Sequence, residues 1–255
     1  IKFKNFKKLQ KDRDISLVNG IGDNFEEVKA ELTFNGNKIK AKVSLKGLLS
    51  DHWRSKVRSS LKVEIKDDKS IFGVAEFSLH KPASRQLPYD QVFQDLQRNL
   101  GNLSPKHYLV NVYFNGEDWG IMNFEERLSK EFLEKQKNKE SLIFEFGGDK
   151  HFVYKNTTDS FYEGYRISDQ YLTQKIFKSK KYLKDTVYRK FYSYVSNISN
   201  KMDPNLYDNN SFSKTLISSF IWNNTHSLQD KNLRYYFNPY NLKLYPITGD
   251  QSFFS

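Results

Sequence analysis

The sequence predicts an α+β fold in two lobes, and two observations support this prediction. Alternating apolar and polar residues flank Asn35-Gly36 and Asn115-Gly116, which is the pattern of two β-hairpins in the first half of the chain. Aromatic and aliphatic residues at helical spacing dominate most of the second half. The expected parts are a lead-in segment at 1–27, a β-rich N-lobe at 28–124 and a mainly helical C-lobe at 125–255.

Local patterns predict the individual elements. Gly101 is expected to end the first helix, and the run 144–148 is expected to break the second. A Pro-Tyr-Asn turn at 239–241 is expected to join two further strands near the end of the chain. In chain order we expect strands at 28–34, 39–45, 61–65 and 76–79, a helix at 92–100, strands at 108–114 and 119–124, and helices from 128, at 169–199 and at 212–222.

Composition excludes several classes of function. The 255 residues contain no cysteine, which excludes disulfides, thiol catalysis and zinc sites built on sulfur. The net charge of +11 comes from basic residues interleaved with acidic ones, so we expect a nucleotide or acidic protein as partner rather than dedicated nucleic-acid binding. No apolar stretch is long enough for a membrane span, and no targeting signal is present. The start lacks an initiating Met, so a domain of a longer chain is expected.

The segment 226–250 has the order of residues that holds a metal-bound phosphate. Asn232 ends a polar loop, a strand hairpin follows, and Asp250 comes at the end of the return strand. Kinase-type phosphotransferases hold magnesium with an Asn of the catalytic loop and an Asp beyond the next hairpin. Two alternatives stay open: Asp250 as a turn residue that stabilises its own backbone, and Asn232 as an amide that caps the strand.

The chain carries two basic strands separated by a Gly-containing loop, a helix around Asp95, a hairpin followed by two glutamates, and the terminal segment. Together these stretches resemble the spore-coat protein H (CotH) kinase family, an atypical branch of the protein-kinase-like fold. The resemblance implies ATP- and Mg- or Mn-dependent phosphate transfer to Ser or Thr of an acceptor protein. It also implies a bacterial protein that is secreted or at the cell surface. The stretches are 42–53, 60–66, 77–79 with Arg85, 112–126 and 226–250.

The resemblance also implies roles for individual residues. Lys62 best matches the strand lysine that contacts the ATP phosphates, with Asp95 on the following helix as its orienting partner. Lys46 is a second candidate cation, because it directly precedes Gly47. The remaining candidates are Arg85 as a phosphate clamp, Glu125 and Glu126 beside the ribose or adenine, and Asp250 and Asn232 as metal ligands. For the lysines and glutamates, a purely solvated surface role stays open.

The general base is the weak point of this resemblance. Ser227 stands where better-known members of the family carry a catalytic Asp. His226 beside it and Asp230 after it are the substitutes that we expect, and His226 as a structural loop residue stays open. Three functions therefore remain: an active kinase, a nucleotide-binding pseudokinase that organises a surface assembly, and a glycan-binding surface module. A kinase-like C-lobe is also expected to need helices beyond Ser255.

Overall fold

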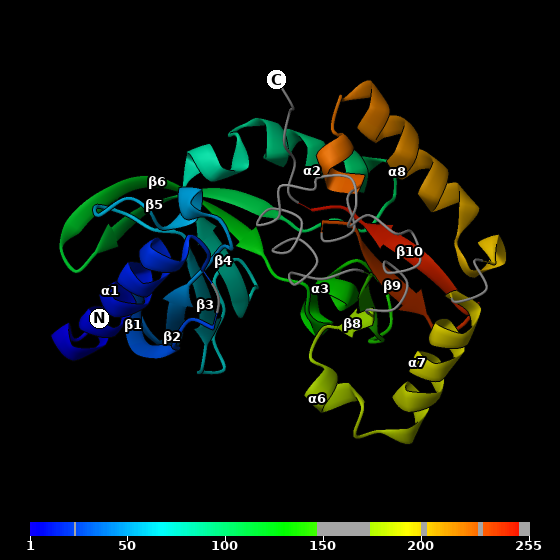
Figure 1. Ribbon diagram of the computed structural model, residues 1–255, viewed down its shortest axis with the longest axis horizontal. Coiled ribbons are helices and arrows are strands. Elements are labelled where there is room, and N and C mark those ends of the chain that lie inside the picture. Colours follow the sequence, from blue (N-terminus) through cyan, green and yellow to red (C-terminus); the bar gives the residue numbers. More distant parts are fainter. Residues whose placement is uncertain (23, 147–173, 200–202, 229–231, 250–255) are drawn as a thin grey trace. The chain divides into compact units, whose positions relative to one another are not determined.

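The computed structural model describes residues 1–22, 24–146, 174–199, 203–228 and 232–249 (Figure 1). The chain divides into two compact units. Unit 1 contains residues 1–91 and 105–132, and unit 2 contains residues 92–104 and 133–255. The fold is α+β, as the sequence predicts.

Unit 1 is built on a six-stranded antiparallel sheet with the order β1-β2-β3-β4-β6-β5. Both predicted hairpins are confirmed, and Asn35 and Gly36 have the positive φ of 48° and 76° that a tight primed turn needs. The strands are β1 (Val28–Phe34), β2 (Asn37–Leu45), β3 (Leu61–Ile65), β4 (Glu76–His80), β5 (His107–Phe114) and β6 (Glu117–Glu126). Short 3-10 helices lie at η1 (Ser50–His52) and η2 (Pro82–Arg85).

The two faces of this sheet differ in chemistry. One face carries the hydrophobic core of unit 1, in which Phe77 and Phe124 stack at 4.1 Å between ring centroids. Because side chains alternate along a strand, the neighbours of these core residues point to the opposite face. That opposite face is polar in its central strands, and it carries the candidate site described below.

The stretch for which the sequence predicts only a polar lead-in is the 17-residue helix α1 (Phe3–Asn19). Gly20 ends the helix in the left-handed conformation with φ 71°. From α1, Arg13 donates hydrogen bonds to three backbone carbonyls of the loop after η1: Trp53 O at 3.0 Å, Arg54 O at 3.0 Å and Ser55 O at 3.3 Å. The helix therefore anchors the loop between β2 and β3.

Unit 2 contains a four-stranded antiparallel sheet with the order β10-β9-β7-β8. The strands are β7 (Ile143–Phe146), β8 (Gln174–Ile176), β9 (Arg234–Asn238) and β10 (Lys243–Ile247). The helices that lie within the described residues of unit 2 include α6 (Ser179–Tyr182), α7 (Thr186–Ser199) and α8 (Asn209–Ile221), with η3 (Pro204–Leu206) and η4 (Thr225–Leu228) between or after them. Helix α2 (Tyr89–Asn99) begins in unit 1 and continues in unit 2, and α3 (Lys130–Lys135) does the same.

Two predictions for unit 2 are wrong in part, and residues 147–148 and 169–173 of these ranges lie outside the described residues. The run 144–148 does not simply interrupt a helix, because Ile143–Phe146 forms strand β7. Within the expected helix 169–199, residues Gln174–Ile176 form strand β8, and helix begins only at Ser179. Strand β7 is a short apolar run and β8 has the sequence Gln-Lys-Ile, and the pairing partners of both strands decide their structure. The helix predicted at 212–222 is confirmed as α8, and the predicted final hairpin is confirmed as β9 and β10.

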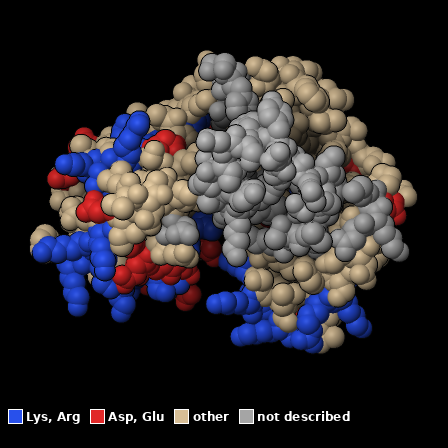
Figure 2. Space-filling model, viewed as in Figure 1, with Lys and Arg blue, Asp and Glu red and all other residues tan. Residues whose placement is uncertain are grey.

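Charged residues are spread over the surface of both units. On the face shown in Figure 2, Lys and Arg alternate with Asp and Glu on unit 1. Exposed lysines at and around α6 include Lys178, Lys180 and Lys184. Within the described part of the chain, no helix combines the length and the apolar character needed to cross a membrane.

Candidate functional site

A row of polar residues crosses the polar face of unit 1 in register. Pairing in the antiparallel ladder places Ser44 opposite Lys62, Lys62 opposite Ser78, and Ser78 opposite Glu125. Glu125 is in turn opposite His107 on β5. Side chains at paired positions lie on the same face of the sheet, so five strands contribute to one line of polar groups.

A second polar row lies beside the first. On β4, His80 pairs with Asn123 of β6, and both side chains are fully buried. Ser60, just before β3, is also fully buried and hydrogen-bonds to His52 Nδ1 at 3.0 Å. Ser78 of the first row is fully buried, and its hydroxyl has no hydrogen-bond partner among the described residues. Buried hydroxyls and imidazoles of this kind are costly unless they serve a network or a ligand.

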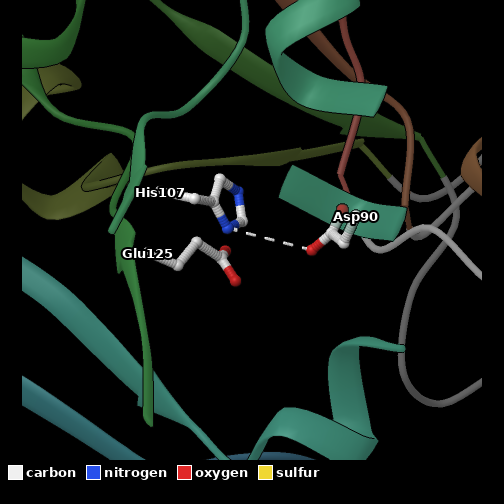
Figure 3. A group of neighbouring side chains, drawn as sticks. All are labelled: Asp90, His107 and Glu125. Carbon is white, nitrogen blue, oxygen red and sulfur yellow. Dashed lines mark ion pairs between the residues drawn. The ribbon is translucent and has the colours of Figure 1, made fainter. Parts of the chain in front are cut away.

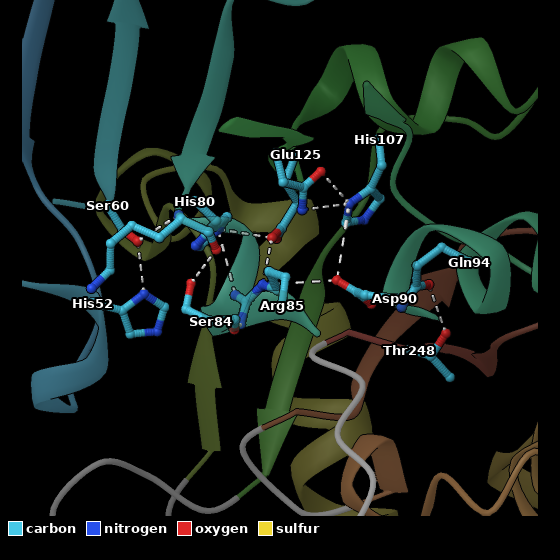
Figure 4. A network of polar contacts seen from close by, with 12 residues as sticks. His52, Ser60, His80, Ser84, Arg85, Asp90, Gln94, His107, Glu125 and Thr248 are labelled. Carbon is cyan, nitrogen blue, oxygen red and sulfur yellow. Dashed lines mark hydrogen bonds and ion pairs between the residues drawn. The ribbon is translucent and has the colours of Figure 1, made fainter. Parts of the chain in front are cut away.

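The network is centred on Arg85 (Figure 4). Its Nε lies 3.1 Å from Glu125 Oε2 and 3.8 Å from Asp90 Oδ2, and its Nη1 donates to Ser84 O at 3.3 Å. His80 Nε2 lies 2.8 Å from the same Glu125 oxygen. The Arg85 side chain is only 7% exposed. The guanidinium therefore ties η2 and the start of α2 to the sheet through buried, charge-assisted contacts.

The ionisation of this cluster follows from its burial. Burial lowers the pKa of His80 to about 3, and the nearby Arg85 charge adds to the effect. A neutral imidazole must then carry its hydrogen on Nε2 to donate to Glu125. Burial alone would raise the pKa of Glu125, but the His80 imidazole and the Arg85 guanidinium outweigh it and hold that pKa well below its usual range. The cluster thus contains an ionised Glu125 carboxylate beside a cationic Arg85 guanidinium.

Three residues of this cluster have the donor set of a metal site. Ligand atoms of Asp90, His107 and Glu125 lie within 4.8 Å of one another (Figure 3). However, Arg85 already contacts both carboxylates, and His107 Nδ1 lies 3.2 Å from Asn123 Oδ1. The guanidinium therefore supplies the positive charge that a metal ion would bring to these carboxylates.

Lys62 and Asp95 each form an ion pair with a different residue. Lys62 Nζ lies 2.7 Å from Glu27 Oε1, just before β1. Asp95 forms an ion pair with Arg98 one helical turn further along α2. The contacts thus give Lys62 an acidic partner that the resemblance does not supply.

The two adjacent glutamates of β6 point to opposite faces of the sheet. Glu125 pairs with Ser78 on the polar face, whereas Glu126 pairs with the core residue Phe77. The Glu126 carboxylate accepts a hydrogen bond from the backbone N–H of Lys106 at 3.3 Å. Of the two, only Glu125 therefore belongs to the polar cluster.

In unit 2, Asn232 lies beside the end of β10. The Asn232 amide nitrogen donates to His226 O at 3.0 Å, which leaves the side-chain oxygen as the atom suited to a hard cation. A side chain on Gly249 would come within 3.4 Å of the Asn232 backbone oxygen. The loop and the residue before Asp250 are therefore neighbours. Asp230 and Asp250 themselves lie outside the described residues.

Ser227, at the position expected for a base, is a structural residue of the loop. It is fully buried in η4, and its hydroxyl donates to Asn224 O at 2.9 Å and contacts Ser219 Oγ at 3.3 Å. Its neighbour His226 is half-buried, and its carbonyl is the acceptor for Asn232. The loop is thus built to hold Asn232 in place.

A protein-family model described as CotH kinase protein matches residues 43–236, which is more than half of the chain. The chain belongs to the CotH kinase family. A search of curated proteins found no match. The matched range includes the polar rows of unit 1 from Ser44 onward and Asn232, whereas Glu27 and Asp250 lie outside it.

The sequence of this CotH kinase family chain does not predict one buried polar contact that involves the terminal segment 226–250. Gln94 of α2 accepts hydrogen bonds from Ser104 Oγ at 2.6 Å and Thr248 Oγ1 at 3.1 Å. All three side chains are almost fully buried, and Thr248 lies two residues before Asp250. No local motif marks Gln94, because its partners lie at distant positions in the chain.

Replacing Ser227 by Ala is expected to lower the free energy of unfolding by about 1–2 kcal/mol, because a buried hydroxyl loses two contacts. Urea unfolding measures the change, and the exposed Ser213→Ala on α8 is the matched control, expected within about 0.5 kcal/mol of the wild type. Loss of phosphate transfer without loss of stability would instead place Ser227 in catalysis.

Acid is expected to destabilise the fold through His80. The unfolded chain binds a proton as the pH falls below the ordinary histidine pKa of 6.5, whereas folded His80 does so only near 3. Between these values the unfolded state holds more protons than the folded state. The free energy of unfolding therefore decreases as the pH is lowered, by up to about 1.4 kcal/mol per pH unit. The lowered pKa of Glu125 adds in the same direction at lower pH.

Urea titrations at several pH values in this window measure the His80 slope. His80→Gln keeps a donor towards Glu125 but cannot titrate, so its slope should be shallower than that of the wild type. The groups that face His80 and could share the effect are Arg85, Glu125, Lys46 and His52. Equal slopes for His80→Gln and wild type would show that His80 does not remain neutral in the folded protein.

Proposed function

We propose that this member of the CotH kinase family transfers the γ-phosphate of ATP to Ser or Thr hydroxyls of an acceptor protein. The single observation that carries the proposal is the polar face of unit 1, where Lys62 stands in register beside the buried, unsatisfied hydroxyl of Ser78. A cation and a hydroxyl at the border of a buried network suit a phosphate group. The Lys62 side chain is 30% exposed, so a ligand can reach it.

Within this proposal, unit 1 is the N-lobe and unit 2 the C-lobe of a protein-kinase-like fold. The antiparallel sheet of unit 1 and the loop-hairpin order in unit 2 support it. Arg85 has a positioning role, since its buried guanidinium is engaged by Glu125. Lys46 lies close enough to His80 for its charge to lower that pKa, and it is a second cation that we propose for the phosphates.

The proposed metal ligands are the Asn232 side-chain oxygen and the Asp250 carboxylate. Oxygen donors of these two types fit Mg or Mn. When bound, the metal would neutralise charge on the ATP phosphates. The chain's own contribution is to hold Asn232 through His226 O and to bring the end of β10 beside it. His226 and Asp230 remain the proposed groups near the acceptor hydroxyl.

The family resemblance supports a bacterial protein that is secreted or at the cell surface, with a surface protein as acceptor. One structural observation favours a second function, a pseudokinase that binds Mg-ATP and organises a surface assembly without turnover. Ser227 is fully buried and hydrogen-bonded within its own loop, so this position offers no base. Transfer that depends mainly on positioning and charge neutralisation can nevertheless proceed without one.

One experiment separates the two functions. The protein is incubated with Mg-ATP or Mn-ATP, alone and with Ser- and Thr-rich acceptor proteins, and intact masses are measured. A gain of one or more phosphates supports the kinase. Thermal stabilisation by ATP with no phosphate gain on any acceptor supports the pseudokinase. If ATP causes neither thermal stabilisation nor a gain of phosphate, nucleotide binding is rejected and the glycan-binding alternative is favoured.

A further inference from the structure

The carboxylate of Glu27 holds two lysines of the polar face at once. Its Oε1 lies 2.7 Å from Lys62 Nζ on β3, and its Oε2 lies 3.4 Å from Lys42 Nζ on β2. Each carboxylate oxygen thus serves one lysine. Glu27 directly precedes β1 and lies outside the residues 43–236 that the family model matches.

The Glu27–Lys62 contact lies at the border between the buried polar row and solvent. The two side chains are 33% and 30% exposed, respectively, whereas the register neighbours of Lys62, Ser44 and Ser78, are buried. A lysine ammonium on a flexible four-carbon stem has many positions open to it. An acid that accepts one of its three hydrogens restricts the ammonium and leaves the other donors for a ligand.

We propose that Glu27 is the positioning residue that orients Lys62 towards the phosphates of ATP. The proposal rests on the proposed nucleotide-dependent function. It replaces Asp95 in the role of orienting acid, since Asp95 forms its ion pair with Arg98 within α2. Two observations on Glu27 itself carry it: the short contact to Lys62 and the second contact to Lys42, which holds the carboxylate between two strands.

The ionisation of Glu27 agrees with this role. The hydrogen bond from Lys62 is the main cause that lowers the pKa of Glu27, and burial only partly opposes it. Glu27 is therefore a carboxylate at neutral pH, with a permanent attraction for the Lys62 ammonium. Without it, the ammonium groups of Lys42 and Lys62 would lose the carboxylate that they share.

Binding titrations with Mg-ATP and with adenosine test the proposal on the whole chain. Glu27→Gln is expected to weaken Mg-ATP binding about tenfold, because one charge-assisted hydrogen bond no longer holds Lys62 in place. Adenosine has no phosphates, so its affinity should not change. In a Lys62→Met background, Glu27→Gln should cause no further loss, and Glu27→Asp should restore part of the affinity.

Glu31→Gln is the matched control, because Glu31 of β1 also forms an ion pair with a lysine, Lys38 of β2, but both side chains are exposed. It should bind both ligands like the wild type. Equal ATP affinity in Glu27→Gln and wild type, tighter ATP binding, or a parallel loss for ATP and adenosine would each overturn the positioning role. If the wild type itself binds no Mg-ATP, the proposed function is wrong and this inference fails with it. Thermal unfolding midpoints confirm that every variant is folded.

Discussion

Replacing Arg85 by Met is expected to lower the free energy of unfolding by about 3–5 kcal/mol, the typical cost of removing one partner of a buried ion pair. The guanidinium contacts the carboxylates of Glu125 and Asp90; Asp90 is fully buried, and the Glu125 side chain is 19% exposed. Met has a similar length, so the loss reports on charge rather than on volume. Urea unfolding at neutral pH measures it.

Two further variants identify the cause of the Arg85 effect. Arg98→Met removes an ion pair to Asp95, whose side chain is 64% exposed, and a pair that is open to solvent typically contributes less than about 1 kcal/mol. In the double variant Arg85→Met with Glu125→Gln, the stranded carboxylate is gone, so part of the stability should return. If Arg85→Met cost no more than Arg98→Met, Arg85 would not be the cation that holds this network together.

The parts of the fold that could be predicted from the sequence are those with local causes. The Asn35-Gly36 and Asn115-Gly116 turns require positive φ, which Asn and Gly adopt readily. The alternation of apolar and polar residues on both sides of each turn predicts the strands. Strand β7 was missed because its few apolar residues fit helix or strand equally well. Its pairing with β9, at the far end of the chain, decides between them.

Helix α1 was missed for a different reason. Its sequence is mostly polar, and only Leu9 and Ser16 are buried, so the usual apolar stripe is absent. The helix is held instead by specific contacts such as those from Arg13 to the loop after η1. Contacts of this kind leave no periodic pattern in a sequence.

In the candidate site, too, the sequence predicts some residues but not the contacts that depend on the fold. Lys62, Arg85 and Glu125 could be selected as residue types from the resemblance, but their partners could not. Glu27 contacts Lys62 only because β1, β2 and β3 are adjacent in the sheet. The choice between Glu125 and Glu126 likewise depends on strand register, since neighbouring residues point to opposite faces.

Replacing Asp250 by Asn is expected to reduce phosphate transfer by about a thousandfold or more, since a metal ion contributes several kcal/mol to stabilising the transferring phosphate. Asn keeps the size and polarity of the side chain but removes the charge that attracts the metal in the proposed site. Asn232, beside Gly249, would remain as a neutral ligand and could not replace that charge. Radiolabel transfer from ATP, measured across a range of Mg and Mn concentrations, gives the rate.

Asp203→Asn is the matched control for Asp250→Asn. Asp203 caps η3 by accepting a hydrogen bond from the Asn205 N–H, and Asn can do the same, so transfer should be unchanged. Raising the metal concentration should recover part of the activity of Asp250→Asn, because weaker metal affinity is the expected defect. Full activity at low metal concentration would show that Asp250 is a turn residue and that the metal is held elsewhere. Loss of transfer with unchanged metal dependence would contradict the ligand role in a different way, because it would place the Asp250 charge in the chemical step itself.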